Sequence, residues 1–98
     1  MVSRHYQEER LKREKAIAKI GYGRVLKTVY MYRQKEGLQI HRLTSTGIIL
    51  IYDATTHRLI TKLIARPGQV QRFYPQGDYP AEVMERAIFH KKLGLNNL

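Results

Sequence analysis

Strand-like patterns of hydrophobic and polar residues recur through the middle of the chain. Most of these segments alternate between apolar and polar positions, which is the two-residue period of a β-strand with one buried face. The third is apolar on both faces, as expected of a central strand. The segments are residues 24–34, 38–44, 48–52, 58–65 and 70–74. Because the connections between them are only a few residues long, we predict a five-stranded antiparallel meander.

Helix-forming residues dominate the two ends of the chain. Residues 3–20 are rich in Glu, Lys and Ala, which favour a helix. The second half of this helix carries Ile17 and Ile20 and is expected to dock, whereas residues 1–14 are expected to project or fray. A second helix is expected to begin near Pro80, because proline suits the first helical position.

Together these elements predict a single α+β domain over residues 1–98. An N-terminal helix precedes the five-stranded antiparallel meander sheet, and a C-terminal helix packs on the sheet, with the helices against one sheet face. The most apolar strands and the stripe of the C-terminal helix supply the predicted core. Its members are Ile49, Ile51, Leu59, Leu63, Val83 and Ile88.

The chain is strongly basic, and its cations are unevenly spread. Its 98 residues include 18 Lys and Arg against 8 Asp and Glu, a formal net charge of +10. Residues 54–77 contain no carboxylate, yet they carry Arg58, Lys62, Arg66 and Arg72. Read with the two-residue period of a strand, the first three of these cations fall on one face of the chain. A row of like charges repels itself, so an anionic partner is expected. We expect that partner to be nucleic acid, with RNA favoured.

Aromatic residues add to the predicted binding surface. Tyr30 and Tyr32 fall on one face of the first strand, where their rings could stack on exposed bases. The alternative is that these rings pack under a helix, as strand aromatics often do. The predicted nucleic-acid-binding residues are Arg58, Lys62, Arg66, Arg72, Tyr30 and Tyr32.

Composition argues against several other classes of protein. The chain has no cysteine, so disulfides and zinc–thiolate sites are impossible, and its four histidines are far apart in sequence. We therefore expect no metal and no cofactor. The polar N-terminus and the lack of a long apolar run favour a cytoplasmic protein without membrane contact.

His41 is the candidate for chemistry. It lies in the middle of a predicted strand, and an imidazole can act as a general base near pH 7. Metal-independent RNA cleavage also needs a cation beside the phosphate and groups that orient it. Arg66 is the candidate cation, and Thr61 or Tyr74 would orient the phosphate. The alternative is that His41 only occupies a half-exposed strand position.

This arrangement of residues resembles the barnase, EndoU, colicin E5/D and RelE-like grouping of small basic ribonucleases. The resemblance rests on a helix followed by an antiparallel sheet, with His41 in an early strand and Ile60-Thr61-x-Leu63 running into Arg66. It covers residues 15–75 and implies that His41, Thr61, Arg66 or Arg72, and Tyr74 form a catalytic set. The C-terminal helix departs from that grouping.

Three functions remain open. The first is a small nucleic-acid-binding domain, which binds RNA without cleaving it. The second is a metal-independent ribonuclease that uses His41 as general base. The third is a protein-interaction module, such as a phage or toxin–antitoxin accessory factor, whose basic face meets an acidic protein.

Overall fold

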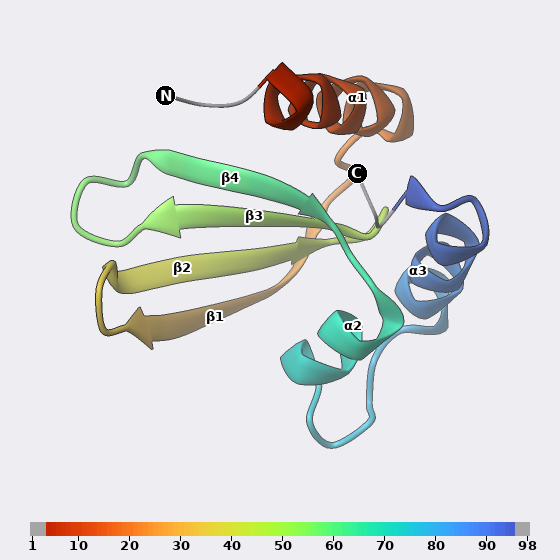
Figure 1. Ribbon diagram of the computed structural model, residues 1–98. Helices are drawn as coiled ribbons and strands as arrows, with labels where there is room; N and C mark the ends of the chain where they lie inside the picture. Colours follow the sequence, from red (N-terminus) through yellow and green to blue (C-terminus); the bar gives the residue numbers. More distant parts are fainter. Residues whose placement is uncertain (1–3, 96–98) are drawn as a thin grey trace.

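A four-stranded antiparallel sheet and three helices make up the computed structural model, which describes residues 4–95 (Figure 1). The sheet has the order β1-β2-β3-β4, so each strand pairs with the next along the chain. The predicted α+β class and antiparallel meander are confirmed. The predicted number of five strands is wrong, because the sheet has four. The elements are α1 Arg4–Ile20, β1 Val25–Arg33, β2 Gly37–Thr44, β3 Ile48–Asp53, β4 Leu59–Ile64, α2 Pro67–Phe73 and α3 Ala81–Lys92.

The predicted fifth strand is a short helix instead. Val70 and Phe73 are both buried and lie three residues apart, which is helical spacing. Pro67 is the first residue of α2, where its missing N–H costs nothing, rather than part of a β-turn. The side chain of Gln69 closes this first turn, because its Oε1 accepts a hydrogen bond from the Arg66 backbone N–H at 2.8 Å. Alternation over five residues was too short a pattern to separate a strand from a helix.

Helices cover both faces of the sheet, not one face as predicted. Consecutive residues of β3 show the division. Ile48 packs with Ile17 of α1 and with Ile64, whereas Ile49 and Ile51 belong to the cluster under α2 and α3. Since successive strand side chains point to opposite faces, α1 lies on one face and the other two helices on the second.

Most of the predicted core is buried, with two exceptions. Ile49, Ile51 and Val83 are buried as predicted, and Leu63 packs against the same cluster. The predicted burial of Leu59 and Ile88 is wrong, because each side chain is 43% exposed. Leu59 begins an edge strand beside a register shift between Ile51 and Tyr52. On α3 the buried positions are Val83, Met84, Ala87 and His90, which leaves Ile88 on the rim of the helix.

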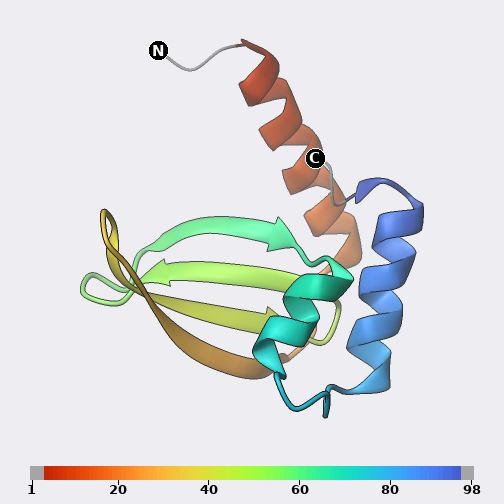
Figure 2. The ribbon, with the colours of Figure 1, turned by 60° about the horizontal axis from the view of Figure 1, so that its bottom comes forward.

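The helices gather at one end of the sheet. Figures 1 and 2 both show the β1–β2 and β3–β4 hairpins extending away from all three helices. The α1 helix docks through its last turns, where Ala16, Ile17 and Ile20 meet the sheet. Its earlier part diverges from the sheet in Figure 2, and Leu11 is exposed there. Much of the sheet face on the α1 side is therefore uncovered.

Candidate nucleic-acid interface

Three tyrosines and two cations share the uncovered sheet face. In the strand register, Tyr30 pairs with Ile40 and Ile40 with Tyr52. The next row runs from Thr28 through Arg42 and Leu50 to Lys62. Directly paired residues in neighbouring strands point to the same side of a sheet. We call this surface the tyrosine face, defined by Tyr30, Tyr32, Arg42, Tyr52 and Lys62.

The rings of the tyrosine face are accessible. Tyr30 is 67% exposed and Tyr32 is 72% exposed, while Tyr52 is half-buried. Both exposed rings lie on β1, an edge strand that no helix of residues 4–95 covers on this side. Large aromatic side chains gain free energy when they are buried, so such exposure marks a surface that a partner could cover.

The cations of this face are held next to aromatic rings. The guanidinium carbon of Arg42 lies 5.1 Å from the centre of the Tyr52 ring, and Lys62 Nζ lies 5.6 Å from that of Tyr22. Both distances are in the range of cation–π contacts. Hydrogen bonding to Tyr22 raises the pKa of Lys62, so this side chain is charged at neutral pH. The rings therefore hold the cations in place without neutralising them.

The tyrosine face lacks negative charge along its strands. The strand residues on this side are Thr28, Tyr30, Tyr32, Leu38, Ile40, Arg42, Thr44, Ile48, Leu50, Tyr52, Ile60, Lys62 and Ile64, and none is a carboxylate. Beside this face, α1 and β4 enclose a groove lined by Arg10, Arg13 and Lys62, with Glu14 as its carboxylate. Glu14 lies 3.7 Å from Arg10, which offsets part of that cation's charge. The surface and its border are thus cationic overall.

The predicted binding residues are divided between the two sides of the sheet. Tyr30, Tyr32 and Lys62 lie on the tyrosine face. Arg58 lies in the β3–β4 loop, and Arg66 directly precedes α2. The expected row of three cations on one strand is therefore wrong, since only Lys62 is within β4. Arg72 lies on α2, beside a pocket on the opposite face of the sheet.

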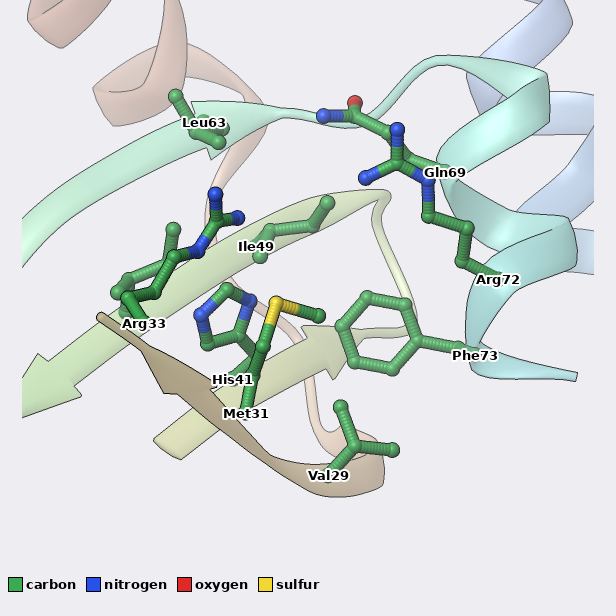
Figure 3. A pocket seen from close by; sticks show the side chains of 10 residues that line it. Val29, Met31, Arg33, His41, Ile49, Leu63, Gln69, Arg72 and Phe73 are labelled. Carbon is green, nitrogen blue, oxygen red and sulfur yellow. The ribbon is translucent and has the colours of Figure 1, made fainter. Parts of the chain in front are cut away.

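This pocket has a volume of about 80 Å³ and contains His41, so we call it the His41 pocket (Figure 3). Its floor is the sheet, and its walls come from β1 and α2. Arg33, Gln69 and Arg72 supply its other polar groups. The apolar lining consists of Val29, Met31, Ile49, Ile51, Leu63 and Phe73.

The proposed catalytic residues lie at different places around the sheet. His41 is buried in the pocket, whereas Thr61 lines the groove between α1 and β4. Arg66 directly precedes α2, and Tyr74 directly follows it. The ammonium nitrogen of Lys27 lies over the Tyr74 ring, 5.3 Å from the ring centre. Burial, and to a smaller degree Asp78, raises the pKa of Tyr74. Of this set, only His41 lines the pocket, together with the alternative cation Arg72.

Hydrogen bonds determine which ring nitrogen of His41 carries the proton. Gln39 Nε2 donates to a carboxylate oxygen of Glu36 at 3.3 Å, and Gln39 Oε1 lies 3.0 Å from His41 Nε2. A carboxylate only accepts, which orients the amide and leaves its oxygen to accept from His41. Burial and the nearby Arg33 lower the pKa of His41, so the imidazole is neutral at pH 7. Its Nδ1 therefore carries a lone pair.

Sequence reasoning missed several residues of both sites. Arg42 and Tyr52 share the tyrosine face, and the two-residue period of their strands could have revealed this once the register was known. Arg33 and Gln69 line the His41 pocket. Gln69 could not be placed there, because the segment that follows it, residues 70–74, was predicted as a strand.

Comparison with protein-family models, curated proteins and solved structures finds no match to this chain. Within residues 4–95, no helix is long and apolar enough to cross a bilayer. In the same part of the chain, no three His, Asp or Glu side chains are grouped so that they could hold a metal ion.

Proposed function

We propose that this protein binds single-stranded nucleic acid on the tyrosine face. The observation that carries the proposal is the exposure of Tyr30 and Tyr32 on the same sheet face as Arg42 and Lys62, where the strands carry no carboxylate. Proteins that bind single strands combine aromatic rings, on which bases stack, with cations that follow the phosphates. RNA is favoured over DNA because proteins mostly read RNA through single-stranded segments with unstacked bases.

The expected energies are sufficient for useful affinity. Stacking one base on an aromatic side chain contributes about 1–3 kcal/mol. Two exposed rings could thus contribute about 2–6 kcal/mol before any phosphate contact is counted. The net charge of +10 would add a salt-dependent attraction that does not depend on sequence.

Binding without cleavage fits the positions of the predicted catalytic residues better than a ribonuclease does. Cleavage requires a base, a cation and an orienting group around one phosphate. Thr61 and Tyr74 lie outside the His41 pocket, in a groove beside α1 and under Lys27. His41 itself lies on the opposite side of the sheet from the exposed tyrosines.

The test is fluorescence anisotropy with a labelled single-stranded RNA of about 12 nucleotides, within the usual site size of such proteins. Tyr30→Ala should weaken binding by about 5- to 150-fold, because one stacking contact is lost. Tyr30→Phe keeps the ring and should bind almost as well as the wild type. Equal affinities for the Ala and Phe variants would show that the ring does not stack on a base.

Lysine variants test the phosphate contacts separately. Lys62→Ala should make the slope of log K against log salt shallower by about 0.7, the value for one contact to a single strand. Lys92→Ala removes the same charge from an exposed position at the end of α3 and should leave the slope unchanged. If polyglutamate competes with the protein as effectively as RNA does, an acidic protein partner would replace nucleic acid as the better interpretation.

A further inference from the structure

The His41 pocket has a distinct arrangement of polar and apolar groups. Its six apolar side chains come from β1, β3, β4 and α2, and they enclose the imidazole of His41. Figure 3 shows the guanidinium group of Arg33 on one side of the pocket, and the guanidinium group of Arg72 and the side-chain amide of Gln69, both from α2, on the other. Two cations therefore flank an apolar cavity with one buried nitrogen base.

The polar groups of this pocket have capacity for a ligand. Within residues 4–95, neither the side chain of Arg33 nor that of Arg72 makes a hydrogen bond or an ion pair. Gln69 uses Oε1 to accept from the Arg66 N–H, so its Nε2 remains a donor. His41 uses Nε2 toward Gln39, so its Nδ1 remains an acceptor. The pocket thus offers donors at its sides and one acceptor inside.

From these groups we infer a binding site for a small organic acid in its carboxylate form. The apolar body of this ligand would carry a hydrogen-bond donor at the end remote from the carboxylate. Arginine matches carboxylates well, because its planar group donates two parallel hydrogen bonds. The apolar walls disfavour a strongly hydrated phosphate. A volume of about 80 Å³ equals the space of several water molecules, which suits a single small ring. This site is independent of the proposed nucleic-acid binding.

The ligand orientation follows from the placement of the groups. The carboxylate would lie between Arg33 and Arg72, within reach of the Gln69 amide nitrogen. The ring would contact Met31 and Phe73, and the donor would reach Nδ1 of His41. A neutral imidazole is required for this last contact, and the buried position of His41 provides it.

Para-hydroxybenzoate is a suitable probe, because its ring, charge and hydroxyl group can each be varied. Isothermal titration should give saturable binding with a dissociation constant on the order of 1 mM or tighter, as expected for a ligand of this size. The amide analogue para-hydroxybenzamide lacks the charge and should bind about 10-fold more weakly or worse. Benzoate lacks the donor and should bind about 2- to 10-fold more weakly.

Variants of the two pocket arginines test where the carboxylate binds, without changing a core residue. Arg33→Gln and Arg72→Gln change exposed side chains, and each should weaken binding by about 10-fold. Arg58→Gln removes an equal charge from the β3–β4 loop and should bind like the wild type. Equal binding of the acid and the amide, or full affinity in both pocket variants, would overturn the inference.

Nuclear magnetic resonance separates this site from the nucleic-acid surface. Para-hydroxybenzoate should shift the imidazole signals of His41 and leave the ring signals of Tyr30 and Tyr32 in place. Single-stranded RNA should do the reverse, if it binds as proposed. Displacement of the small ligand by RNA would assign the pocket to the nucleic-acid site and overturn a separate carboxylate site. An RNA that fails to bind leaves this titration unaffected.

Discussion

Two buried histidines should make the folded state less stable as the pH falls below neutrality. His41 is 6% exposed and His90 is 1% exposed. Burial lowers the pKa of both, and Arg33 and Arg86 respectively lower it further. The unfolded chain binds a proton at each histidine near pH 6.5, before the folded state does. Stability is therefore complete above about pH 6.5 and is lost as the pH falls toward the lowered folded pKa.

The size of the effect follows from proton linkage. Consider a histidine that titrates at about pH 6.5 in the unfolded chain and stays neutral in the folded state. Lowering the pH from 7.5 to 5.5 then reduces the free energy of unfolding by about 1.4 kcal/mol for each such residue. Two such residues would lower the free energy of unfolding by at most about 2.8 kcal/mol. Asp53 contributes in a different range. Hydrogen bonds from the Thr56 and Thr55 amides lower its pKa, so its stabilisation is lost only in more acidic solution.

His90 is the better position at which to test this. Its Nδ1 has no hydrogen-bond partner within residues 4–95. An apolar replacement of the ring would therefore break no hydrogen bond at that atom. His90→Leu should reduce the pH-dependent loss by about half, measured by urea unfolding at pH 7.5 and 5.5. Val83→Ala is the control, because it should lower stability at both pH values and leave their difference unchanged. An undiminished difference in His90→Leu would refute the reasoning.

Two further variants test the packing of the helices. Gly47→Ala should destabilise the fold by about 1–2 kcal/mol in thermal or urea unfolding, because Gly47 has a φ of +82°. An added Cβ would also lie 3.3 Å from Cε1 of His90. Ile17→Ala should cost about 2–5 kcal/mol, since this buried side chain joins α1 to Ile48 and Ile64. A melting temperature equal to that of the wild type would show that α1 does not dock there.

The parts of the fold that the sequence predicted are those with a long periodic signal. The first four strands and both terminal helices extend over enough residues for their periods to be distinguished. The short connections correctly indicated that neighbouring strands pair. Within β1, the placement of Tyr30 and Tyr32 on one shared face was also predicted.

The parts that were missed depend on information that local patterns do not carry. Alternation tells which residues share a face of a strand, but not which face meets which helix. The placement of α1 opposite α2 therefore needed the tertiary structure. A register shift near Tyr52 exposed Leu59, and no feature of the local sequence marks it. The His41 pocket needed α2, whose seven residues were too short to recognise.

The two-residue period of β1 explains how one strand can serve two sites. Tyr32 and Arg33 are neighbours in sequence, yet the first lies on the tyrosine face and the second lines the His41 pocket. Because successive side chains point to opposite sides, a nucleic acid on one face and a small carboxylate on the other would not collide. The backbone of the sheet separates the two sites, with Ile40 buried on the tyrosine face and His41 buried on the pocket side. A base stacked on Tyr32, as proposed, would contact the aromatic side of β1, while the alternate residues would remain accessible to a ligand of quite different chemistry.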